Sequence, residues 1–154
     1  MKSILFLVSI FTLSISSYAQ DATAIRKKHF NLDGDIGIKG YDPVAYFTEH
    51  KAIKGNKGLS VFYKGVIYNF SSIANKELFK ASPSKYEPEY GGWCAYAMGK
   101  NGEKVSVDPE TLKITDGKLY LFYNKFLTNT LKDWNKNEAT VKKNADANRQ
   151  KLYK

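Results

Sequence analysis

Cysteine is nearly absent from this sequence, since the 154-residue chain contains only Cys94. A single cysteine excludes an internal disulfide framework, so packing has to stabilise the fold. Histidine is almost as scarce, with only His29 and His50. Neither lies in a recognisable Cys-His or Ser-His signature, and no glycine-rich phosphate loop or dinucleotide fingerprint is present. The sequence therefore favours a binding protein over an enzyme, and we predict no catalytic residue.

Long runs of like charge are also missing, although the formal net charge is +9. The lysines are spread along the chain, and no block of five or more like charges occurs. Such a distribution is typical of general solvation rather than of a nucleic-acid-binding tract. We expect no nucleic-acid partner.

The N-terminus has the order of a secretory signal. Lys2 is followed by a mostly apolar stretch over residues 4–13 and by small residues that end at Ala19. This order predicts a signal peptide over residues 1–19, cleaved before Gln20, and a protein exported to the periplasm or the exterior. Serines interrupt the apolar stretch before it is long enough to span a bilayer, so we expect no stable membrane insertion after cleavage.

After the signal, we predict a polar N-terminal segment over residues 20–39 and one domain with a helical tail over residues 40–154. Asp42 is expected to cap a short helix that begins at Pro43. Alternating β-branched and aromatic residues on both sides of Lys64-Gly65 predict a hairpin. A central helix is expected from about Ser72 to Ala81, followed by a turn and loop over residues 83–92.

The C-terminal part predicts a second hairpin and then helices. Asp116-Gly117 separates two apolar stretches, which is a strong two-residue hairpin signal. Beyond it, apolar and small residues recur at helical spacing. They are Leu127, Leu131, Trp134, Val141, Ala145, Asn148 and Leu152. Hairpins mixed with helices indicate an α+β domain.

Three stretches carry a family resemblance. They are Gly-Tyr-Asp-Pro-Val-Ala-Tyr-Phe at 40–47, Tyr-Asn-Phe-Ser at 68–71 continuing through Phe79, Pro83 and Tyr86, and Tyr-Gly-Gly-Trp-Cys-Ala-Tyr-Ala at 90–97. Together they resemble the secreted branch of the YHS-domain family, which Ala-Asp-Ala-Asn at 145–148 also resembles. The resemblance implies a small α+β YHS-like domain.

At the positions where the family has its usual metal ligands, this chain has other residues. Metal-associated YHS domains have cysteines at the positions that match Ala45, Ser71 and Asn75 of this chain. The remaining soft donors are Cys94 and Met98, which with a histidine would suit monovalent copper. Copper is therefore the cofactor to test, with Cys94 and Met98 as its candidate ligands.

Two interpretations of Cys94 stay open at this point. The secreted branch resembles proteins that include selenoproteins, so Cys94 is a candidate reactive thiol for a redox protein. A lone cysteine among apolar residues is also typical of a buried core position.

Aromatic residues around Cys94 suggest a ligand site. The chain has eleven tyrosines, several of them in the two glycine-framed motifs. We predict a small-ligand site lined by Tyr41, Asp42, Tyr46, Tyr90, Trp93, Cys94 and Tyr96. The function favoured by the sequence is an exported, non-enzymatic protein that binds a small ligand or a metal ion, and the alternative is a thiol-dependent redox protein.

Overall fold

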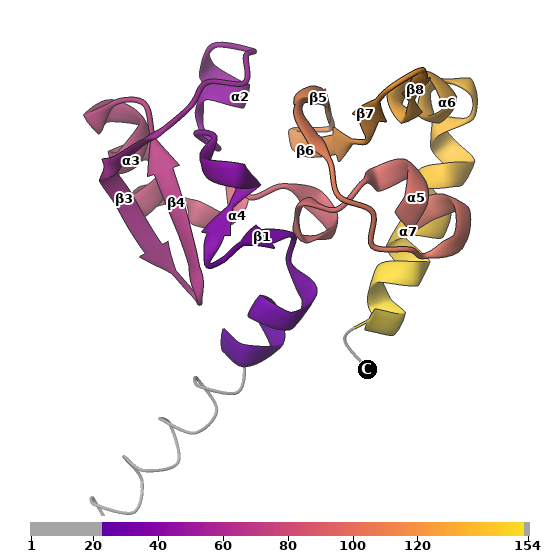
Figure 1. Cartoon of the computed structure of the whole chain (residues 1–154), viewed down its shortest axis with the longest axis horizontal. Coiled ribbons are helices and arrows are strands. Elements are labelled where there is room, and N and C mark those ends of the chain that lie inside the picture. Colours follow the sequence, from indigo (N-terminus) through magenta and orange to yellow (C-terminus); the bar gives the residue numbers. More distant parts are fainter. Residues whose placement is uncertain (1–22, 153–154) are drawn as a thin grey trace, which may run out of the picture.

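The computed structural model describes residues 23–152, and the predicted signal peptide lies outside them. Figure 1 shows an α+β arrangement in which the N-terminal half lies on one side and the C-terminal half on the other. This confirms the predicted fold class. Within residues 23–152, no helix combines the length and the apolar character needed to cross a bilayer.

The N-terminal half is built on a four-stranded sheet with strand order β1-β2-β4-β3. Its strands are β1 (Leu32–Asp33), β2 (Ile36–Gly37), β3 (Asn56–Tyr63) and β4 (Val66–Phe70). The predicted hairpin is β3–β4, where Lys64 and Gly65 both have positive φ, as a type I′ turn requires. β2 pairs in parallel with β4, so part of the segment 20–39 belongs to the folded domain.

Short helices surround this sheet. They are residues 23–29, η1 (Ile38–Gly40), α2 (Ala45–Thr48), α3 (Ile73–Ala81), α4 (Pro83–Tyr86) and η2 (Glu89–Gly92). The central helix is confirmed as α3, with the Ser72 side chain accepting from the Asn75 N–H. The turn and loop predicted over 83–92 is corrected to the two helices α4 and η2, because Pro83 occupies the first turn of a new helix instead of only ending the previous one.

The C-terminal half combines two hairpins with three helices. Its elements are α5 (Ala95–Asn101), β5 (Asp108–Thr115), β6 (Lys118–Phe122), β7 (Asn124–Lys125), β8 (Thr128–Asn129), α6 (Thr130–Lys136) and α7 (Glu138–Leu152). The hairpin at Asp116-Gly117 is confirmed as β5–β6. Leu127 was wrongly placed on a helix, because it lies in the turn between β7 and β8 and is fully exposed.

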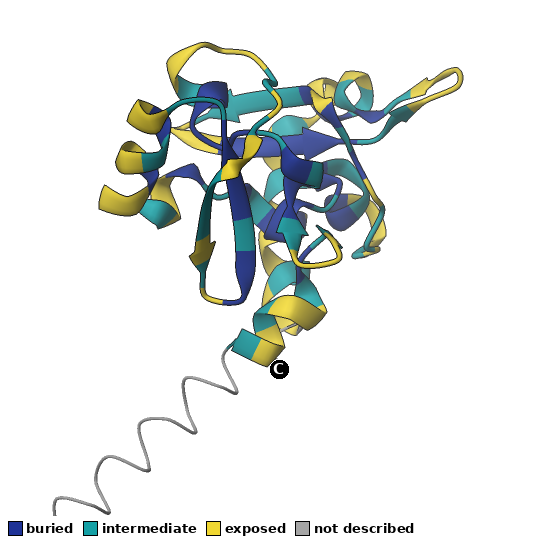
Figure 2. Cartoon of the chain, turned by 60° about the vertical axis from the view of Figure 1, so that its left-hand side comes forward, coloured by how far each residue is buried: buried dark blue, intermediate teal, exposed yellow. Residues whose placement is uncertain are grey.

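Two apolar clusters form the core, and the start of α5 joins them. Cys94 belongs to the larger cluster with Phe70 and Phe79, while the next residue, Ala95, belongs to the cluster around Trp134. The buried segments in both halves are dark in Figure 2. The side chain of Tyr96 packs against both clusters. The beginning of α5 is therefore fixed from two sides.

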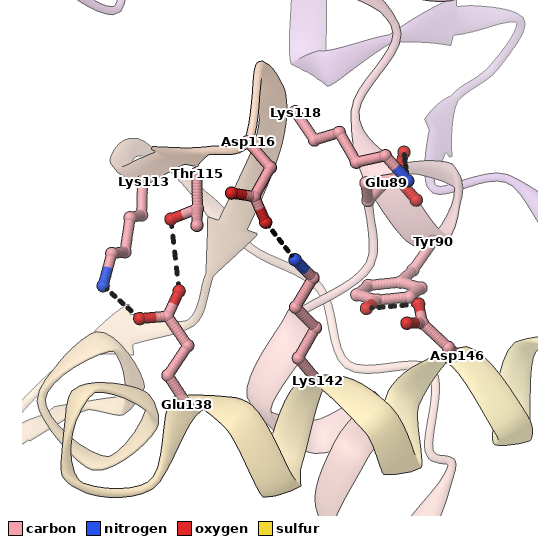
Figure 3. A network of polar contacts seen from close by, with 9 residues as sticks. All are labelled: Glu89, Tyr90, Lys113, Thr115, Asp116, Lys118, Glu138, Lys142 and Asp146. Carbon is pink, nitrogen blue, oxygen red and sulfur yellow. Dashed lines mark hydrogen bonds and ion pairs between the residues drawn. The ribbon is translucent and has the colours of Figure 1, made fainter.

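Polar contacts fasten α7 across the second hairpin and η2. Figure 3 shows that Glu138 accepts hydrogen bonds from Lys113 and Thr115, and that Lys142 donates to Asp116. Further along the same helix, Asp146 accepts from the hydroxyl of Tyr90 at 3.0 Å. These contacts hold the C-terminal helix along its length against elements that precede it by 20 residues or more.

A close approach between α5 and α7 explains a glycine in the middle of α5. A Cβ at Gly99 would clash with the backbone carbonyl oxygen and with Cγ1 of Val141 on α7. Only glycine allows the two helices to come this close at that point.

We predict that Gly99→Ala destabilises the protein by about 1–3 kcal/mol, because the added methyl group pushes α7 away from α5. Helix propensity alone would give the opposite sign, a gain of up to about 1 kcal/mol. Urea unfolding of the variant and the parent measures the difference, and a stabilised Gly99→Ala protein would contradict the packing.

Candidate functional site

The first predicted motif is organised by the buried carboxylate of Asp42. Its Oδ1 accepts from the backbone N–H groups of Val44 at 2.8 Å and Ala45 at 3.3 Å, ahead of α2. Asp42 therefore caps this turn, but α2 itself begins at Ala45, two residues later than the predicted start at Pro43. Capping uses only one of the two oxygens of this carboxylate.

The second oxygen joins Asp42 to the segment that follows the first sheet. Its Oδ2 accepts from the N–H of Ser71 at 2.8 Å, from the Ser71 hydroxyl at 2.6 Å and from Nδ2 of Asn75 at 2.8 Å. Five donors thus surround a side chain with no solvent exposure. Such a set compensates for burying the carboxylate without a cation.

These contacts bear directly on the metal prediction. Ala45, Ser71 and Asn75, which the resemblance matches to thiols, all donate to this one carboxylate. None of them carries a soft donor, and the carboxylate oxygens are already occupied by hydrogen bonds. A copper ion does not fit this donor set.

The second candidate pair for a metal site is Cys94 and Met98. Both side chains are fully buried, but they lie in different apolar clusters. Nδ1 of His29 is 3.1 Å from the ammonium of Lys104, and burial with the nearby Lys104 and Lys28 lowers the pKa of His29. Among residues 23–152, no group of three or more His, Cys, Asp or Glu side chains could hold a metal ion.

Cys94 lies at the N-terminal end of α5, inside a closed set of hydrogen bonds. Its Sγ accepts from the backbone N–H of Tyr123 at 3.4 Å and lies 3.3 Å from Oγ1 of Thr130. The Thr130 hydroxyl donates its only proton to the carbonyl oxygen of Tyr123 at 3.0 Å. The thiol proton is then available for Thr130 Oγ1, so the neutral thiol satisfies every donor in the set.

A cavity of about 210 Å³ lies next to this thiol. It is lined by Cys94, Tyr96, Ala97, Lys100, Asn101, Glu103, Val105, Tyr123 and Thr130. The lining is mainly apolar, with Lys100 and Glu103 as its charged groups, and the Lys100 ammonium is 6.0 Å from the centre of the Tyr96 ring. Two of the seven predicted ligand residues, Cys94 and Tyr96, therefore meet at one cavity.

The other five predicted residues do not line this cavity, and their polar groups have hydrogen-bond partners in other parts of the protein. Tyr41 donates to Glu110 and Tyr46 to the carbonyl of Pro109. The Tyr90 hydroxyl faces Asp146, where burial first and then the carboxylate raise its pKa. Nε1 of Trp93 donates to the carbonyl of His29 at 2.7 Å.

Sequence reasoning missed most of the cavity lining. Val105, Tyr123 and Thr130 come from three segments outside the two motifs, and no spacing in the sequence relates them to Cys94. Thr130 carried a local signal only as the first residue of a helix capped by Asn129. No protein-family model, curated protein or solved structure matches the chain.

We predict that Asp42→Ala lowers the free energy of unfolding by about 2–4 kcal/mol, because it leaves buried donors without an acceptor. Denaturant unfolding measures this loss. The matched control is Asp35→Ala, which removes a half-exposed pair with Lys27 and should change stability by no more than about 0.5 kcal/mol. Equal effects of the two substitutions would contradict the structural role of Asp42.

For Cys94 we expect slow modification by a thiol reagent in the native protein, on the order of a hundredfold slower than in denaturant, because the sulfur is exposed only by local opening. Cys94→Ala should cost about 1–2 kcal/mol of stability through the lost hydrogen bonds. Rapid native modification, with a thiolate pKa well below the usual value of about 8.5, would instead support the redox alternative.

Proposed function

We propose that the protein is an exported, non-enzymatic binding protein of the YHS-like type that holds a small organic ligand in the cavity beside Cys94. The observation that carries this proposal is the meeting of the lone cysteine with Tyr96, Lys100 and Thr130 around one mainly apolar space. An apolar wall with a few polar groups at defined positions is typical of small-molecule sites.

The size of the cavity limits the ligand. An apolar cavity of about 150 Å³ is enough to bind benzene. The cavity beside Cys94 measures about 210 Å³, so it has room for a single-ring molecule with one polar substituent. Tyr96 supplies an aromatic surface for such a ring. Of the two charged groups in the lining, Lys100 attracts a substituent with negative or partial negative charge, and Glu103 one with positive charge.

The burial of Cys94 favours binding over thiol chemistry. The sulfur has no solvent exposure and is held between Tyr123 and Thr130. A redox thiol needs access to its partner and stabilisation of the thiolate. The buried sulfur meets the access requirement poorly, which favours the binding proposal.

A cavity-filling substitution tests the binding site. Ala97→Leu places additional methyl groups in the cavity and should weaken binding of phenol and benzoate by about tenfold or more, because ring and side chain would compete for one space. NMR titration of the full chain with each compound measures the affinity. The matched control is Ala139→Leu, at an exposed position of α7, which should leave both affinities unchanged.

Two results would contradict the proposal. The first is the absence of binding of either compound to the parent protein, combined with a native mass that shows no retained small molecule. The second is equal binding by Ala97→Leu and the parent. The same mass, recorded on the exported form, tests whether the mature chain begins at Gln20.

A further inference from the structure

The turn between β7 and β8 presents two large apolar side chains to solvent. Phe126 is 98% exposed and Leu127 is 104% exposed. The next most exposed large apolar residues among residues 23–152 are Ile73 at 68% and Phe62 at 65%. Figure 2 shows a hairpin with an exposed tip that projects from the body of the molecule. Phe126 and Leu127 therefore contribute nothing to the core.

The backbone at this tip is also unfavourable for the residue that occupies it. The strand register leaves Phe126 and Leu127 as a two-residue loop, and Phe126 has a φ of 54°. A positive φ at the first loop position alone is the type II′ pattern, which favours glycine there and is strained for a bulky side chain. The other two-residue hairpins, Lys64-Gly65 and Asp116-Gly117, have a positive φ at both loop positions, which is the type I′ geometry with glycine at the second position.

The base of the hairpin is fixed, so the tip is held in place. Asn124 donates to Oγ1 of Thr111, and Asn129 caps α6 by accepting from the Leu131 N–H. Thr130 is buried beside Cys94. Because the base of the hairpin is fixed, less backbone ordering is needed when the exposed apolar pair enters an apolar environment, which favours association.

The charged residues near the tip indicate what kind of surface it would bind. No Asp or Glu occurs from Gly117 to Lys132, whereas lysines occur at positions 118, 125 and 132. The carboxylates that flank this stretch, Asp116 and Asp133, are paired with Lys142 and Lys136. Lys125 and Lys132 are exposed and take part in no ion pair within residues 23–152. Basic residues beside exposed apolar side chains match a surface of anionic lipid, which attracts lysine and accepts the apolar groups below its headgroups.

We propose that the β7–β8 hairpin docks the protein on an anionic lipid surface, with Phe126 and Leu127 entering the interface and Lys125 and Lys132 meeting the headgroups. Docking of this kind needs no membrane-spanning helix. It is separate from ligand binding, because neither apolar tip residue lines the cavity beside Cys94.

The first experiment places a reporter at the tip of the full chain. Leu127→Trp is mixed with vesicles of phosphatidylcholine and phosphatidylglycerol that carry brominated acyl chains. We expect its added fluorescence to shift to the blue and to be quenched. Phe62→Trp, at the other exposed phenylalanine, is the matched control and should remain unquenched.

A second pair of variants measures the contribution of the tip to binding. Phe126→Gly with Leu127→Asn supplies a favourable type II′ sequence, so it should fold at least as stably as the parent. In vesicle sedimentation, its affinity for anionic vesicles should fall by at least about tenfold, which corresponds to about 1.4 kcal/mol. Phe62→Ser should sediment like the parent, and pure phosphatidylcholine should bind the parent more weakly than the anionic mixture.

Several outcomes would overturn the proposal. An unquenched Leu127→Trp on vesicle-bound protein would show that another segment, such as residues 1–22, carries the binding. Equal sedimentation of the Gly-Asn variant and the parent would also show that the tip does not carry the binding. Loss of a dimer in the Gly-Asn variant, without any vesicle binding by the parent, would assign the tip to a second copy of the chain.

Discussion

The N-terminal half depends on the hydrogen bonds that converge on the carboxylate of Asp42. It is a negative charge without solvent exposure, and five hydrogen-bond donors converge on it. Those donors come from the turn that leads into α2, from the residue after β4 and from the first turn of α3. One side chain thus fixes the relative positions of three segments that are separated by up to 33 residues. The cost of burying the charge is offset only while all three segments stay in place, which makes this arrangement cooperative.

A second constraint joins the two motifs through a segment that neither contains. Tyr46 donates to the carbonyl of Pro109, and the N–H of Cys94 donates to the carbonyl of Val105. The stretch 105–109 therefore lies between the first motif and the start of α5. Of the predicted ligand residues, only Tyr46 donates into this stretch, while the indole of Trp93 donates to the carbonyl of His29. The hydroxyls of Tyr41 and Tyr90 donate to the carboxylates of Glu110 and Asp146.

The cavity beside Cys94 and the exposed hairpin tip share a structural base. Tyr123 precedes β7 and Thr130 follows β8, and both residues contact the sulfur of Cys94. The same two residues line the cavity, while the turn between the strands carries Phe126 and Leu127. The proposed ligand site and the proposed docking tip are thus the two ends of one small hairpin. Ligand occupancy and docking can be measured separately, since no side chain belongs to both.

Local patterns in the sequence determined the elements whose signals are short-range. The turns at Lys64-Gly65 and Asp116-Gly117 predicted both long hairpins, because the dihedral angles they need are available to few residues. Ser72 and the apolar spacing after it predicted α3. The same reasoning misplaced Leu127, since helical spacing from Leu131 and Trp134 extends back to it with no break in the pattern. The strained turn that exposes it has no glycine to reveal it.

Only the tertiary structure decided which residues meet. The sequence indicated that Asp42 would cap a helix, but not that its second oxygen would bind Ser71 and Asn75, because hydrogen bonds across 29 and 33 residues leave no periodic trace. Cys94 and Tyr96 were singled out from the sequence, while Val105, Tyr123 and Thr130 were not. A cavity wall is assembled from whichever segments the fold brings together, and their spacing along the chain carries no record of it. The chemistry of single residues is therefore local information, and their grouping into a site is a property of the packed chain.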